Sequence, residues 1–130
     1  MSVHPNVEQL QRGYKAFGDG DMEVLAEIIP ENAVWHVGGN NQLTGDYRGR
    51  DAIFGYFAKL MELSNGTFKA DLIHAIADDH FACALQRSTA TANGVDYDAT
   101  DVLIDRMENG VAVETWLYVE DAAKLDRMFA

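Results

Sequence analysis

The sequence predicts an α+β fold: a cone-shaped, curved antiparallel sheet with three helices from the N-terminal half packed on its concave face, and a short C-terminal helix. Apolar residues recur at helical spacing in the first half, whereas the second half alternates apolar and polar residues around two hairpin signals, Asn93-Gly94 and Asn109-Gly110. The strands there span about 9 to 13 residues, long enough to curl around a pocket. We expect residues 1–130 to form one domain.

Three helices are expected from their caps and apolar stripes. Asn6 is the predicted N-cap of the first, and Gln9 completes a capping box. Asp21 caps the second, Pro30 stops it, and the third runs over residues 51–63. The stripes that should face the core are Val7, Leu10, Tyr14 and Phe17; Val24, Leu25, Ile28 and Ile29; and Ile53, Phe54, Phe57, Leu60 and Met61.

Strands account for most of the remaining chain. A first strand is predicted over residues 32–37, followed by a glycine-rich loop over 38–49 that should form a mobile lip over the pocket. Two long strands follow helix three, then a strand over 95–107 and a last one over 111–119. A short helix from about residue 121 ends the chain.

Composition excludes several classes of partner. The 130 residues include 10 Lys and Arg against 21 Asp and Glu, a net charge of −11. Such a surface repels phosphate backbones and anionic lipid, so we expect no nucleic-acid and no membrane partner. No apolar run approaches the roughly 18 residues of a membrane span. The N-terminus lacks a secretory pattern, so a cytoplasmic location is expected.

No cofactor or metal site is expected either. The four histidines are dispersed, and no HxH, HExxH or CxxC spacing occurs. The loop over 38–49 matches neither GxGxxG nor a P-loop. Cys83, the single cysteine, excludes an internal disulfide and falls in an apolar strand pattern typical of a buried thiol.

Three motifs carry a family resemblance. The segments 14–21 (YKAFGDGD), 35–37 (WHV) and 45–50 (GDYRGR) resemble the SnoaL-like branch of the nuclear transport factor 2-like superfamily. That superfamily includes ketosteroid isomerases, limonene epoxide hydrolases and polyketide cyclases. The resemblance implies a pocket for a small hydrophobic molecule and a homodimer that pairs through the outer face of the sheet. It is more specific for fold than for chemistry, because this fold hosts many activities.

The resemblance to ketosteroid isomerases transfers only in part. The position of their general base corresponds to Val37, which cannot take a proton. Their oxyanion-hole tyrosine falls close to Tyr14, and the place of their protonated acid falls on Leu103, with Asp101 two residues earlier on the same face. The Arg-x-Asp constellation of the epoxide hydrolases is missing after Arg87. The cyclases imply an aspartate acid/base with a nearby histidine.

Asp101, Tyr14 and His74 are therefore the candidate catalytic residues, each with an alternative structural role. A buried Asp101 could act as an acid or a donor, or it could be an edge carboxylate satisfied by solvent or by Arg87. Tyr14 could donate into the pocket or belong to the core, and His74 could replace the missing base or be a half-buried, hydrogen-bonded histidine. His36 alternates with its neighbours and should face away from the pocket. The expected ligand-binding residues are Phe17, Trp35, Val37, Phe54, Phe57, Leu103, Trp116 and Tyr118.

Two functional hypotheses remain open. The first is a pocket protein for a small hydrophobic ligand, as an isomerase- or cyclase-like enzyme on a carbonyl-bearing compound of steroid or polyketide type. The second is a non-catalytic ligand-binding or dimerisation module. Two titratable groups that converge in one cavity would favour the enzyme, whereas a single acid in an apolar pocket would favour the binding module.

Overall fold

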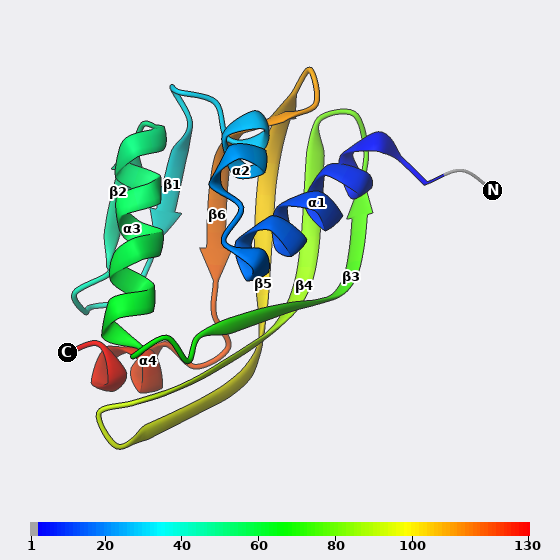
Figure 1. Ribbon diagram of the computed structural model, residues 1–130. Coiled ribbons are helices and arrows are strands. Elements are labelled where there is room, and N and C mark those ends of the chain that lie inside the picture. The colour runs from blue at the N-terminus through cyan, green and yellow to red at the C-terminus, as the bar shows by residue number, and fades with distance from the viewer. Residues whose placement is uncertain (1–2) are drawn as a thin grey trace.

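The computed structural model describes residues 3–130, which form four helices and a six-stranded sheet (Figure 1). Helices α1, α2 and α3 lie on one face of the sheet, and α4 lies at the end where β6 leaves it (Figure 1). None of the described helices is long and apolar enough to cross a membrane. The helices are α1 (Pro5–Asp19), α2 (Met22–Ile28), α3 (Arg50–Leu63) and α4 (Ala122–Met128). The strands are β1 (Val34–Val37), β2 (Gly45–Arg48), β3 (Lys69–Ala77), β4 (Phe81–Ala92), β5 (Val95–Glu108) and β6 (Val111–Tyr118).

The strand order is β2-β1-β6-β5-β4-β3, which confirms the α+β plan with one difference in pairing. Strand β1 runs parallel to β6, while the other neighbours are antiparallel, so the sheet is mixed rather than wholly antiparallel. The parallel pair arises because α3 and four strands intervene between β1 and β6. Strand β2 lies inside the segment expected to be loop, since four residues are too few for a detectable period.

The helix ends are set by local hydrogen bonds. The predicted Asn6 cap of α1 is wrong: Pro5 begins the helix, and His4 is the N-cap, whose Nδ1 accepts from the Asn6 backbone N–H at 3.0 Å. The Gln9 side chain does not complete a capping box but donates to the Gly110 carbonyl at 2.6 Å, tying α1 to the β5–β6 turn. The Asp21 cap of α2 is confirmed by its bond from the Val24 N–H at 3.2 Å.

Two β-bulges decide which side chains face the helices. Both Asn-Gly turns adopt the positive φ angles that such hairpins require. Ile73 in β3 and Val113 in β6, however, have no partner in the register, so alternation restarts beyond each bulge. His74 consequently pairs with Leu85 on the outer face, opposite to its predicted direction. Trp116 pairs with Ile104 and also turns outward.

The inner face of β4 carries small side chains. Four alanines and Ser88 are buried there together with Gln86, while the other large residues of β4 point to the outer face. Cys83 belongs to that outer face and is half-buried, in contrast to the fully buried thiol expected. Aromatic side chains from the helices and β1 fill part of the space above the alanines, with Phe57 packed edge-on against both Phe17 and Trp35. Small residues under large ones leave room for cavities between the sheet and the helices. The buried inner positions of β4 are Ala82, Ala84, Gln86, Ser88, Ala90 and Ala92.

Candidate functional site

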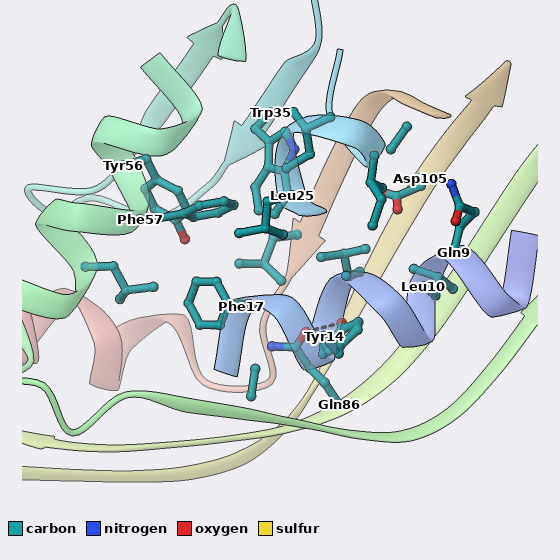
Figure 2. Close-up of a pocket in the computed structure, with 18 of the residues that line it drawn as sticks. Gln9, Leu10, Tyr14, Phe17, Leu25, Trp35, Tyr56, Phe57, Gln86 and Asp105 are labelled. Carbon is teal, nitrogen blue, oxygen red and sulfur yellow. Dashed lines mark hydrogen bonds between the residues drawn. The ribbon is translucent and has the colours of Figure 1, made fainter. Parts of the chain in front are cut away.

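A cavity of about 100 Å³ lies between α1 and the inner face of the sheet (Figure 2). Its wall is mostly apolar, and the polar side chains that reach it come from α1, α3, β4 and β5. Concave, apolar sites with a few convergent polar groups are the usual form of a ligand site. We call it the first cavity. Its polar lining residues are Gln9, Tyr14, Tyr56, Gln86 and Asp105, and its apolar wall includes Leu10, Phe17, Leu25, Ile28, Trp35, Phe57 and Leu103.

Asp105 is the carboxylate of the first cavity. It lies on the inner face of β5 and is only 6% exposed. Burial raises its pKa to about 7, although the Thr115 hydroxyl, which donates to Oδ1 at 2.5 Å, lowers the pKa in part. No described residue donates to the other oxygen, Oδ2. A carboxyl group with this pKa exchanges a proton near neutral pH, as a general acid or base must.

Tyr14 is the second titratable group of the same cavity. Its hydroxyl, on the sheet-facing side of α1, donates to the Gln86 side-chain carbonyl (Figure 2). The Gln86 amide in turn donates to Ser88 Oγ at 2.8 Å, so each hydrogen bond is donated in the same direction, from Tyr14 to Gln86 and from Gln86 to Ser88. Burial, followed by the negative charges of Asp105 and Asp101, raises the pKa of Tyr14, so its hydroxyl stays protonated.

Asp101 lines a second cavity of about 200 Å³ that adjoins the first. It is 3% exposed, and its Oδ1 accepts from the Tyr97 hydroxyl at 2.8 Å and from the Glu120 N–H at 3.0 Å. The alternative partner Arg87 is wrong, because Arg87 binds Asp98 at 2.6 and 2.9 Å on the outer face. The residues common to both cavities are Tyr56, Leu60, Phe68, Gln86 and Leu117.

Gln86 separates Tyr14 from Asp101, two of the three catalytic candidates named from the sequence. It is paired with Asp101 across β4 and β5, and it accepts the hydrogen bond of Tyr14. Tyr14 and Asp101 therefore lie on either side of one buried amide, in adjoining cavities. Asp105, two residues beyond Leu103 on the same face of β5, was missed, although the parity that selected Asp101 also selects Asp105.

The expected ligand-binding residues divide among three places. Those that line the first cavity are Phe17, Trp35, Phe57 and Leu103, and those that line the second are Val37 and Tyr118. Phe54 lines neither cavity and stacks on Phe57 with ring centroids 6.0 Å apart. Trp116 stacks on His36 on the outer face, and Tyr118 is 57% exposed at the rim, because the bulge in β6 turns both outward. His74 is exposed and reaches neither cavity.

The loop after β1 closes one side of the second cavity. The carboxylate of Asp126 in α4 accepts from the Asn40 N–H and from the Asn41 side chain, both at 2.8 Å, and these bonds lower the pKa of Asp126. Gly39 has φ 94°, and a Cβ there would lie 2.8 Å from Asp126 Oδ1, so glycine permits the close approach. The segment expected to be a lip is thus fastened to the C-terminal helix.

His36 lies outside both cavities, on the outer face predicted by alternation. Its Nδ1 is 2.7 Å from Asp46 on β2, and its Nε2 is 2.6 Å from Glu114 on β6. The bonds to Glu114 and then to Asp46 raise the pKa of His36. Among residues 3–130, no group of three His, Cys, Asp or Glu side chains is arranged to hold a metal ion.

The profile of the SnoaL-like domain family matches residues 10–115. The chain belongs to the SnoaL-like family. This assignment confirms the resemblance drawn from the three sequence motifs, and the six-stranded curved sheet with its covering helices agrees with the α+β fold of structural relatives. No curated protein matches the chain significantly.

Solved structures extend the comparison. Bal32a, from a soil-derived mobile gene cassette, is 34% identical over 98% of each chain, with a TM-score of 0.93. A Xanthomonas campestris protein of unknown function with a cystatin-like fold is 30% identical over 96% of this chain and 98% of that one, with a TM-score of 0.88. IdmH from Streptomyces antibioticus, proposed as a polyketide cyclase, is 20% identical over 98% of this SnoaL-like chain and 100% of its own, with a TM-score of 0.78. At that identity the likeness to IdmH concerns the fold.

Proposed function

We propose that this SnoaL-like protein binds a small hydrophobic compound that carries a carbonyl group and acts on it as an isomerase- or cyclase-like enzyme. The observation that carries the proposal is the placement of Asp105 and Tyr14 in one apolar cavity, with the pKa of Asp105 near neutrality. Two titratable groups that line a common cavity are the pattern expected of an acid/base site rather than of a simple binding pocket. The activity proposed for IdmH points in the same direction.

Asp105 is the acid/base of the proposed reaction. Its ionised carboxylate takes a proton from the carbon next to the ligand's carbonyl group, and the electron pair of that C–H bond moves toward the carbonyl to give an enolate. If a C=C bond is conjugated with the enolate, the same carboxyl group returns the proton to the far carbon of that system, which isomerises the ligand. Otherwise the enolate carbon attacks a second carbonyl, which closes a ring, and the alkoxide that forms takes the proton back from Asp105. A pKa of about 7 suits both directions of transfer.

Tyr14 and the apolar wall prepare the ligand for this step. The tyrosine hydroxyl stays protonated, so it can donate to a ligand oxygen if that oxygen displaces Gln86. Phe17, Trp35 and Phe57 exclude water, which strengthens the electrostatic interactions inside the cavity. Asp105 thus takes the role that the sequence assigned to Asp101, which lies in the adjoining cavity.

The test is α-proton exchange of ketones in deuterium oxide, followed by proton NMR with acetophenone and 2-tetralone. We expect the wild type to accelerate exchange and Asp105→Asn to lose at least a hundredfold of the acceleration, since general-base catalysis is worth about 10²- to 10⁴-fold. Asp71→Asn, an exposed carboxylate on β3, is the matched control and should match the wild type. Loss of exchange in Asp101→Asn with retention in Asp105→Asn would restore the Asp101 hypothesis.

A dimerisation role is the second candidate, and one observation favours it. Apart from Val3 and Met22, the large apolar side chains that are most exposed lie on the strands of the sheet. Exposed apolar patches on a folded protein usually mark an interaction surface. If the wild type fails to exchange either ketone above the rate in buffer, the enzymatic proposal is wrong and a binding or dimerisation module is the better description.

A further inference from the structure

One buried polar atom of a residue that lines the first cavity has no partner. Within residues 3–130, the indole nitrogen of Trp35 is the single buried side-chain nitrogen or oxygen without a hydrogen bond. Trp35 lines the first cavity, and its indole N–H can only donate. Buried donors in native proteins are almost always paired, so an orphan in the wall of a cavity calls for an explanation.

Packing against aromatic rings does not supply that partner. Trp35 meets Phe57 edge-to-face, with centroids 5.0 Å apart and an angle of 80°, and lies 6.1 Å from Tyr56. A contact between an N–H group and a ring face is weaker than an N–H···O bond and does not replace it. The indole N–H therefore lacks a strong acceptor among the described residues.

The sheet register places Trp35 beside the proposed acid/base. Trp35 on β1 pairs with Thr115 on β6, and Thr115 pairs with Asp105 on β5, so the three residues form one row across the inner face. Neighbouring strands are about 4.8 Å apart, which separates the backbones of Trp35 and Asp105 by roughly 10 Å. A single ring that lies over Thr115 can touch both the indole and the carboxyl group. Figure 2 shows both side chains directed toward the same cavity.

Trp35 also differs from the Tyr14 hydroxyl, another donor that lines the cavity. The Tyr14 hydroxyl already donates to Gln86, so a ligand must break that bond to receive it. The Trp35 N–H has no bond to lose. An oxygen that gains negative charge as Asp105 removes a neighbouring proton would find in Trp35 a donor that is already in place, which is the arrangement that stabilises such charge most.

We propose that Trp35 Nε1 donates a hydrogen bond to the carbonyl oxygen of the ligand and thereby selects compounds with an acceptor oxygen at that point. The inference deepens the proposed function and rests on it in one respect, the use of the first cavity as the ligand site. It names the substrate group, a ketone-type carbonyl next to an ionisable C–H, and the residue that recognises it.

The binding test uses two compounds of the same shape. Acetophenone carries a carbonyl oxygen where α-methylstyrene carries a methylene group. Dissociation constants are measured by calorimetry for the wild type, Trp35→Phe and Trp116→Phe, which removes the outward-facing indole as a control. From the net worth of one hydrogen bond, we expect the wild type and Trp116→Phe to favour acetophenone roughly three- to tenfold, and Trp35→Phe to lose that preference.

A second readout needs no substitution in the cavity. In ¹⁵N-labelled wild-type protein, acetophenone should move the indole proton resonance of Trp35 downfield, whereas α-methylstyrene should not, and the Trp116 resonance should stay in place. The proposal is wrong if Trp35→Phe keeps the preference, if acetophenone binds without moving the Trp35 signal, or if neither compound binds. A ketone that binds through Trp35 but undergoes no exchange would reject the enzyme and leave this assignment standing.

Discussion

At the scale of the residue, Asp105 gives the site its reactivity at the expense of stability. Its folded pKa of about 7 exceeds the roughly 3.9 of an unfolded aspartate. The folded state therefore holds a proton that the unfolded state releases. The stabilisation from this group is complete below about pH 4 and declines as the pH rises to about 7.

We expect Asp105→Asn to become more stable relative to the wild type as the pH rises. The amide oxygen can still accept the Thr115 hydroxyl, but it carries no charge to bury at high pH. The difference in unfolding free energy between variant and wild type should shift toward the variant by up to about 4 kcal/mol between pH 4 and pH 8. Urea titrations of both proteins at several pH values measure it. A difference that does not depend on pH would contradict the assignment of a raised pKa to Asp105.

At the scale of the element, His36 on β1 links the short edge strand β2 to β6 through its two hydrogen bonds. Its bonds to Glu114 and Asp46 favour the charged imidazole, so the folded pKa is raised. The stabilisation is complete below the unfolded pKa of roughly 6.5 and is lost as the pH rises through the raised folded value. These bonds therefore hold β2 best in mildly acidic solution.

Replacing His36 by Gln should loosen β2 at low pH more than at high pH. We expect a loss of about 1 kcal/mol in unfolding free energy at pH 6 and a smaller loss at pH 9, together with faster hydrogen exchange of the amides of residues 45–48 at pH 6. His74→Gln is the control, because no described residue hydrogen-bonds to the exposed His74 side chain. Equal losses at both pH values would show that His36 acts through packing on Trp116 instead.

The helices and strands also show which parts of the fold can be predicted from the sequence. The long helices and strands were predictable, since caps, Asn-Gly turns and apolar periods extend over many residues. The bulges at Ile73 and Val113 were not, because an extra residue in a strand leaves no periodic signal, and each reverses the faces beyond it. His74 and Trp116 were misplaced for that reason, and Tyr118 lines the second cavity only from its exposed rim. Asp105 lies on β5, whose residues alternate regularly between the two faces, so simple alternation identifies its face.

At the scale of the whole molecule, the outer face of the sheet is the largest feature that the helices leave uncovered (Figure 1). Ile76 is 61% exposed and Leu85 39%, and both point to this face from β3 and β4. The resemblance to its family led us to expect a homodimer through this face. Two chains with a charge of −11 each repel one another, so any pairing must rest on apolar burial and should strengthen when salt screens the charges.

We therefore expect the wild type to sediment as a dimer at micromolar concentrations and Ile76→Lys to sediment as a monomer. A lysine in the centre of the interface would bury an unpaired charge in each copy, at a cost of several kcal/mol. Met22→Lys, which adds the same charge to an exposed position on α2, should remain dimeric. If Ile76→Lys stays dimeric and Met22→Lys does not, the copies meet through the helices, and the outer face has another role. If the wild type is monomeric and salt does not change this, pairing through the sheet is excluded, and the cavities must function within one chain.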